Sequence, residues 1–165
     1  MSVAERLADA SNRVYLRIRH PKAWEAQASA EGTFEALRNH KYALLHTFRR
    51  SGEGVPTPVW FGLADDKLYF RTYANAAKIK RIRAEPRVLV GPCDVRGKPK
   101  GPMVEASARV LSEPEEERAE RAIQANYGLF RRAYEGGFGM KVAGAYVELT
   151  PSVDSPPTGG PEVPR

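Results

Sequence analysis

Residues 42–72 read YALLHTFRRSGEGVPTPVWFGLADDKLYFRT, and this stretch decides the fold. Short apolar runs alternate here with turn residues, a pattern typical of β-strands rather than helices. We expect strands at 42–48, 56–62 and 67–72, with turns at 49–54 and at Asp65-Asp66. Pro56 and Pro58 favour an edge position for the second strand, because proline cannot donate to a ladder. The stretch therefore predicts a β-meander at the core of the protein.

Five further elements are expected after this stretch. They are a helix at 76–84 capped by Asn75, strands at 87–92 and 103–111, a helix from Ser112 to about Tyr134, and a strand at 143–150. The run Val88-Leu89-Val90 is typical of a strand buried on both faces. Glu115 lies three residues after Ser112, the spacing of a capping box. Six short strands and two helices predict a mainly β fold, a small closed or nearly closed barrel with α decoration.

Both ends of the chain differ in composition from the predicted barrel at 41–150. Residues 1–40 are polar and rich in helix formers, above all at 23–36, and Ser2 with Glu5 forms a second capping box. We interpret them as an N-terminal helical extension that packs on the barrel or on a partner subunit, with a lid over the site as the alternative. Residues 151–165 are rich in Pro, Gly and Ser, which predicts a disordered tail.

The composition excludes several classes of protein. A chain of 165 residues with 42% hydrophobic residues has room for one domain of ordinary size. Its single cysteine, Cys93, cannot form an internal disulfide, and no signal peptide or membrane-spanning run is visible, so we expect a cytoplasmic protein without membrane contact. The net charge of +6 fits nucleic acid or a phosphorylated small ligand. No aromatic residues interleave with the basic run at 78–83, which argues against nucleic acid.

The residues most suited to a ligand lie around the third strand. Lys78 follows Thr72 by six positions at the start of a helix, where an ammonium, a hydroxyl and the helix dipole could meet one phosphate. Trp60 and Pro58 could line a flat ring, because proline leaves backbone groups of this strand unpaired. The alternatives are a solvated basic helix face for Lys78 and a core position for Trp60.

The other reactive residue types form no recognisable site. The histidines His20, His40 and His46 share no metal-ligand spacing with carboxylates or with the cysteine, so we expect no metal. Cys93 is interpreted as a small buried apolar residue. The segment 97–101 reads GKPKG, which lacks the spacing of a phosphate-binding P-loop and is interpreted as a turn.

Six segments between residues 34 and 150 occur in a familiar order. They are YALLHTF (42–48), VPTPVWF (55–61), AKIKRIR (77–83), EPRV (85–88), GPCDVRGKP (91–99) and VEASARV (104–110). In this order they resemble the pyridoxamine 5'-phosphate oxidase-like superfamily, specifically its F420-dependent branch, the flavin/deazaflavin oxidoreductases of B type.

The resemblance implies a homodimeric, six-stranded split β-barrel with a cofactor at the subunit interface. It implies that Thr72 and Lys78 face the cofactor phosphate, with Arg71 and Lys80 as weaker candidates. It places Pro58, Val59 and Trp60 along the tricyclic ring, and residues 93–100 of the other subunit near the same site. The cofactor of such enzymes performs the hydride transfer, and the family shares no obligatory protein acid or base, so no catalytic residue is assigned.

One departure from the family bears on the cofactor. True pyridoxamine-phosphate oxidases carry an arginine and a lysine on the strand equivalent to 56–61, and this strand has neither. The departure favours F420 over FMN, because surplus cations such as Arg49, Arg50 and Arg81 could serve the anionic F420 tail. The expected function is an F420-dependent reductase of a small unsaturated or quinone-like substrate. The alternatives are an FMN-binding oxidoreductase and a protein that binds a cofactor or nucleic acid without turnover.

Overall fold

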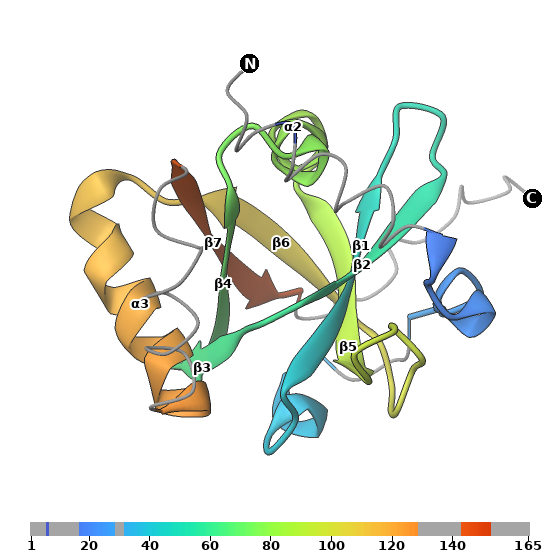
Figure 1. The fold of residues 1–165 in the computed structure, drawn as a ribbon, viewed down its shortest axis with the longest axis horizontal. Helices are drawn as coiled ribbons and strands as arrows, with labels where there is room; N and C mark the ends of the chain where they lie inside the picture. The colour runs from blue at the N-terminus through green and yellow to red at the C-terminus, as the bar shows by residue number, and fades with distance from the viewer. Residues whose placement is uncertain (1–5, 7–16, 29–31, 129–142, 153–165) are drawn as a thin grey trace, which may run out of the picture.

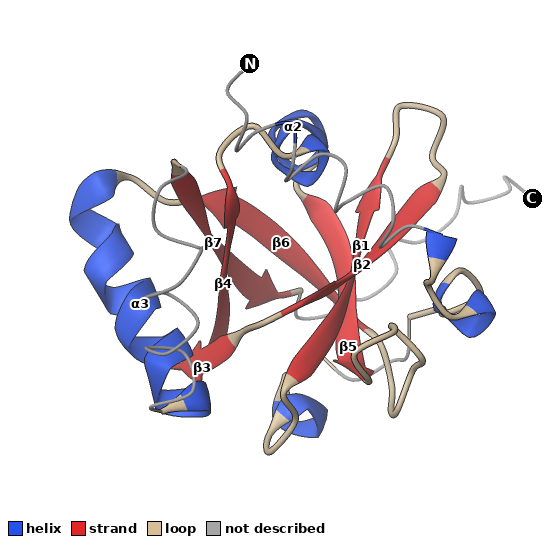
Figure 2. Ribbon diagram, in the orientation of Figure 1, coloured by secondary structure: helices blue, strands red, loops and turns tan. Residues whose placement is uncertain are grey.

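One curled antiparallel sheet forms the centre of the fold (Figure 1). The computed structural model describes residue 6 and residues 17–28, 32–128 and 143–152. The strands are β1 (Tyr42–Phe48), β2 (Gly54–Val59), β3 (Gly62–Ala64), β4 (Lys67–Tyr73), β5 (Arg87–Cys93), β6 (Val104–Val110) and β7 (Gly144–Pro151). The helices are α2 (Ala77–Ala84) and α3 (Glu113–Tyr127), with 3-10 turns η1 (Pro21–Ala23) and η2 (Glu35–Leu37). The mainly β class with α decoration is confirmed, and Figure 2 shows the helices outside the sheet.

The sheet has seven strands in the order β2-β1-β5-β6-β7-β4-β3, so the expected count of six is wrong. The extra strand arises because the expected strand 56–62 is divided after Val59 and resumes at Gly62. At Gly62 the chain presses against α3, since a Cβ there would lie 2.1 Å from the carbonyl oxygen of Ala122. The local bend therefore turns one predicted strand into two.

The expected meander is also wrong, although both of its hairpins are present. β1 pairs with β2, and β3 pairs with β4 across a turn in which Asp65 and Asp66 both have positive φ. The two hairpins lie at opposite edges of the sheet, because β1 also pairs with β5 and β4 with β7. β2 is an edge strand as predicted, and its prolines explain why no further strand pairs with it.

The core lies inside the curl and is closed at one end by α2. Ile79 and Ile82, three residues apart on one face of α2, point into the main cluster of buried apolar residues. The run at 88–90 in β5 is buried on both faces, with Val88 and Val90 inside the curl and Leu89 in a second cluster outside it. α3 covers the outer side of β3, β4 and β7.

Several helix predictions need correction. α2 begins one residue later than expected, and Ala76 rather than Asn75 is its N-cap, with no side chain bonded to the helix terminus. The Ser112 capping box is present, since the Glu115 carboxylate accepts from the Ser112 backbone N–H, but α3 ends at Tyr127. Residues 23–36 contain only 3-10 turns where they are described, because prolines and glycines at positions such as Pro21 and Gly32 interrupt any longer helix.

The remaining terminal predictions lie outside the described residues. These are the capping box of Ser2 and Glu5 and almost all of the expected C-terminal tail. Within the part of the chain that the structure describes, no helix is long and apolar enough to cross a bilayer.

Candidate functional site

The predicted pair Thr72 and Lys78 meets where β4 leads into α2. Lys78 Nζ donates a hydrogen bond of 3.2 Å to Thr72 Oγ1. Burial and then the charges of Arg81 and Arg19 lower the pKa of Lys78 to about 8. This contact joins a hydroxyl and an ammonium as the sequence predicted, and their role toward a phosphate remains a prediction.

Arg81 follows Lys78 by three residues, so both side chains lie on the same side of α2. Its Nε donates a hydrogen bond of 2.7 Å to Oγ1 of Thr47, a buried residue of β1. Burial is the main cause that lowers the pKa of Arg81, followed by the charge of Arg49. Arg81 therefore ties α2 to β1 while the rest of its guanidinium lies beside Lys78.

Arg19, from the segment before η1, is the third cation in this region. Only 6% of its surface is exposed, and its Nε and Nη1 have no hydrogen-bond partner among the residues that the structure describes. Its Cζ lies 5.8 Å from the centroid of the Trp24 ring, within cation–π range. Burial and the charge of Arg81 lower its pKa to about 10, so the side chain is still a cation at neutral pH. The sequence interpretation missed Arg19, because it belongs to no motif and lies more than fifty residues before α2.

We call Arg19, Lys78 and Arg81 the cation cluster. None of the three forms a salt bridge with a carboxylate among the described residues. Each has a pKa below its ordinary value, since neighbouring positive charges and burial both penalise the charged form. A phosphate or carboxylate from a ligand would relieve this repulsion.

A second group of three cations, around Glu148, has the opposite electrostatic arrangement, because its positive charges are paired with a carboxylate. Lys67, Arg109 and Arg118 all reach the buried carboxylate of Glu148, at distances of 3.2, 2.9 and 2.8 Å. Tyr69 donates a further bond of 3.0 Å to the same carboxylate. Burial opposes ionisation, but these bonds outweigh it and hold the pKa of Glu148 below its ordinary value. This group is internally neutralised and stabilises the packing of β4, β6, β7 and α3.

The predicted ring-lining residues lie at the far end of β2 from the cation cluster. Val55 pairs with Thr47 beside the cluster, and Trp60 lies five residues further on, roughly 17 Å away at about 3.3 Å per residue. Trp60 stacks on Tyr127 of α3, with ring centroids 5.1 Å apart. Val59 is buried in the core, so its side chain contributes packing rather than a ligand surface. Only an extended ligand would reach both ends of this strand.

Pro58 lies on the free edge of β2. It faces Leu44 of β1, and because proline has no N–H, this pair cannot exchange two backbone hydrogen bonds. The backbone of Pro58 therefore points away from β1 and offers a carbonyl acceptor without a donor. Such an edge resists pairing with another strand but leaves a polar acceptor for the rim of a ligand.

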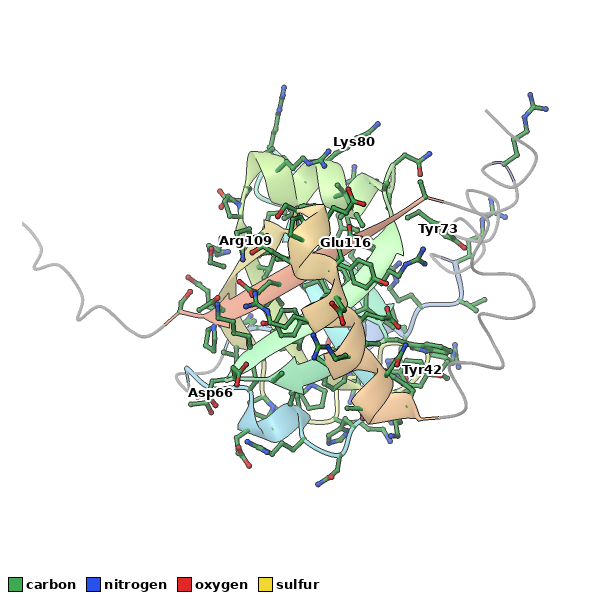
Figure 3. The ribbon with its side chains drawn as sticks, turned by 90° about the vertical axis from the view of Figure 1, so that its left-hand side faces the viewer. Tyr42, Asp66, Tyr73, Lys80, Arg109 and Glu116 are labelled. Carbon is green, nitrogen blue, oxygen red and sulfur yellow. The ribbon has the colours of Figure 1, made fainter. Side chains whose placement is uncertain are left out.

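The two weaker candidates do not join the cation cluster. Arg71 lies beside Tyr146 of β7, with its Cζ 5.8 Å from the ring centroid, on the face of β4 opposite Thr72. Lys80 is exposed and projects outward from α2 (Figure 3). Their contribution to a ligand site remains a prediction.

The other reactive residues have structural explanations. Cys93 is 2% exposed, and burial, then Asp94, raise the pKa of its thiol to about 12. The Asp94 carboxylate accepts bonds from the N–H groups of Arg96 and Lys98, which makes residues 94–98 a turn that overlaps the one predicted at 97–101. Among the described residues, no group of His, Cys, Asp and Glu side chains could hold a metal ion.

Two hollows, of about 370 and 540 Å³, lie elsewhere, beside η2 and β3. They share Arg38 and Leu63 in their linings, and neither touches the cation cluster. The larger hollow is lined by charges of both signs, with more carboxylates than cations (Glu35, Arg38, Asp65, Asp66 and Lys67), and the smaller has Arg38 alone. Neither gathers cations without carboxylates as the cation cluster does, so we place the candidate site at α2.

Comparisons with known proteins agree with the architecture. Residues 30–145 match the family described as pyridoxamine 5'-phosphate oxidase. No curated protein matches the chain.

Three solved structures with a similar fold are distant from this chain in sequence. A conserved hypothetical protein, Rv2991 from Mycobacterium tuberculosis, has 17% identity and a TM-score of 0.54 over 81% of this chain and 84% of its own. The haem storage protein HutZ from Vibrio cholerae has 14% identity and a TM-score of 0.54 over 72% and 86%. An FAD-binding protein from Mesorhizobium loti has 16% identity and a TM-score of 0.52 over 72% and 84%. At these identities the structures show a shared fold alone.

Proposed function

This chain belongs to the pyridoxamine 5'-phosphate oxidase family, and on that premise we propose that it is an oxidoreductase that binds coenzyme F420, with FMN as the second candidate. The observation that carries the proposal is the contact of Lys78 Nζ with Thr72 Oγ1 inside a cation cluster that has no carboxylate among the described residues. Family membership suggests a phosphorylated, ring-bearing cofactor, and the cluster supplies the matching charge.

The residues present fit a phosphate. Lys78 offers an ammonium, Arg81 a guanidinium and Thr72 a hydroxyl, all within one region of the surface. The buried, unbonded N–H groups of Arg19 show that this region has donors to spare. A flavin-type cofactor, when bound, supplies hydride transfer, and the protein supplies position and electrostatics.

The ring of such a cofactor would lie along the edge of β2, between the cation cluster and Trp60. The carbonyl of Pro58 would face the rim of the ring, and the stacked pair Trp60 and Tyr127 would bound its far end. Substrate would then be a small unsaturated or quinone-like molecule that fits beside the ring and displaces water from it. A second copy of the chain would complete the groove with residues 93–100.

F420 is favoured over FMN by the cations on and near this strand. β2 itself carries no Arg or Lys. Exposed cations lie on the neighbouring elements, Lys80 in α2 beside Lys78 and Arg50 three residues after Thr47, and they suit a long anionic tail. FMN stays the second candidate because the cluster itself would serve the phosphate of either cofactor. Haem binding or another non-catalytic role is the third candidate, because the haem storage protein HutZ has a similar fold.

Titration of the purified protein with F420 and with FMN, followed by fluorescence, tests the proposal. Lys78→Ala should weaken binding of the preferred cofactor by about 1.5 to 3 kcal/mol, the range for a charge-assisted hydrogen bond. Arg83→Ala is the matched control, because Arg83 lies on the same helix and is exposed. Binding of neither cofactor by the wild-type protein would refute the function, and equal affinity in Lys78→Ala would remove Lys78 from the site.

A further inference from the structure

We infer that Arg19 is a third anion-binding residue and that residues 17–24 form a built wall of the cofactor site rather than a peripheral extension. The identity of the anion as a cofactor phosphate rests on the proposed function. The inference itself rests on three observations, which are the fixed backbone around Arg19, the unbonded atoms of its guanidinium, and the positive charges that face it.

The backbone on both sides of Arg19 is held in place by the turn after β5. The N–H of His20 donates to the carbonyl of Arg96 at 2.9 Å, and Arg96 Nε donates to the carbonyl of Ile18 at 3.2 Å. Ala23, in η1, is fully buried against the cluster that contains Leu44. Arg19 is therefore presented from a docked segment with little freedom to leave the site.

The guanidinium of Arg19 is buried without the partners that such a group normally has. A buried charge is ordinarily paired and fully hydrogen-bonded, because desolvation of an isolated charge is costly. Here Nε and Nη1 have no acceptor, and the Trp24 ring provides one cation–π contact. Nε and Nη1 point in different directions, because Nη1 lies on the side of the guanidinium that carries Cδ, so each can donate to a different acceptor oxygen.

Among the described residues, the charge that perturbs the pKa of Arg19 and the two groups whose pKa values Arg19 perturbs all belong to basic side chains. Arg81 lowers the pKa of Arg19, and Arg19 in turn lowers the pKa values of Lys78 and His46. His46 is also buried, and its Nε2 lacks a hydrogen-bond partner. Positive charges that repel one another destabilise the protein without ligand, and a bound anion would stabilise it. In this respect binding sites commonly differ from structural ion pairs, whose charges are already neutralised.

The test compares ligands with and without a phosphate in Arg19→Met and in the control Arg17→Met, which changes an exposed arginine of the same segment. FMN is paired with riboflavin, and F420 with its deazaflavin lacking the phosphate and tail. We expect Arg19→Met to weaken the phosphorylated ligands about tenfold or more and the unphosphorylated ones less than twofold. Arg17→Met should leave both unchanged. Arg19→Lys should fall between wild type and Arg19→Met, because it keeps the charge and loses the separate guanidinium donors.

The thermal unfolding midpoint of the ligand-free protein separates binding from a structural role. If Arg19 serves an anion, Arg19→Met removes a repelled, unpaired charge, and the midpoint should stay level or rise. A fall in the midpoint, a variant that does not fold, or unchanged affinity for the phosphorylated ligands would overturn the inference.

A further experiment distinguishes failure of this inference from failure of the proposed function. If the wild-type protein binds neither flavin-type cofactor, the same proteins are heated with inorganic phosphate and with pyrophosphate. A midpoint raised by these anions in wild type and Arg17→Met but not in Arg19→Met supports the anion site while the proposed function fails. Equal response of all three proteins, or none in wild type, counts against Arg19.

Discussion

Binding of a phosphorylated cofactor should weaken as the pH rises through 8, because Lys78 must carry a proton to hold a phosphate. In the free protein the pKa of Lys78 is lowered to about 8 by burial and by the charges of Arg81 and Arg19. The charged fraction therefore falls from about nine tenths at pH 7 to about one tenth at pH 9. If the bound phosphate restores the ordinary pKa, the dissociation constant should rise about tenfold over this interval.

Fluorescence titrations of F420 or FMN from pH 7 to 9.5 measure this slope, with Lys78→Arg as the comparison. Arginine stays charged across the range, so its profile should be flatter by about one unit of log Kd, whatever its absolute affinity. Titration of the ligand's own groups is common to both proteins and cancels in the comparison. Parallel profiles for wild type and Lys78→Arg would refute the role given to Lys78.

The lowered pKa of Lys78 also determines how the stability of the ligand-free protein changes with pH. Between pH 8 and the ordinary lysine value of 10.5, the unfolded chain binds more protons at this position than the folded chain. The contribution of Lys78 to the free energy of unfolding therefore rises with pH across that window. Lys78→Met should remove this contribution, which urea unfolding at pH 8 and 10 would detect as a flatter dependence.

Two further predictions concern the rest of the fold. Glu148→Gln should lower the free energy of unfolding by about 2 to 4 kcal/mol, since it leaves three cations around a buried neutral group. The control Glu117→Gln breaks an exposed pair with Arg121 and should lower the free energy of unfolding by less than about 0.5 kcal/mol. The Glu148 contribution is present above pH 4.5 and lost as the pH falls through its lowered pKa, and equal urea midpoints for the two variants would contradict it. Cys93 should react with iodoacetamide at pH 8 about a thousandfold more slowly in the native protein than after unfolding, because its pKa is raised to about 12, and comparable rates would show that the thiol is accessible.

Local sequence patterns located most of the strands to within a few residues, but they did not predict the division of β2 from β3 or the arrangement of the sheet. The bounds of β1 agree with the prediction residue for residue, since a strand bounded by turn residues is recognisable from its own apolar run. The placement of the two hairpins at opposite edges depends on pairings between strands about forty residues apart or more, such as β1 with β5 and β4 with β7. Nothing in a window of ten residues encodes those partners.

The candidate site divides in the same way. Thr72 and Lys78 could be paired from the sequence because only six residues separate them, within reach of one strand end and the next helix. The contact of Arg81 with Thr47 spans 34 residues, and Arg19 lies further still from α2. The sequence does contain a weak indication that Arg19 has a defined environment. Pro21 prevents a helix from continuing through this segment, and Trp24 lies close by for a cation–π contact.

The net charge of +6 says little about function until the positions of the carboxylates are known. Both groups of three cations described above bring together residues that are distant in the sequence, and both are partly buried. In one of them Glu148 supplies the anion from β7, so its charges contribute to stability and leave nothing for a ligand. In the other, Lys78 and Arg81 are bonded to threonine hydroxyls, which satisfy hydrogen bonds without cancelling charge. Hydroxyl partners orient the cations and preserve their attraction for an anion, and for this reason we assign the site to α2 and not to the more extensively bonded group around Glu148.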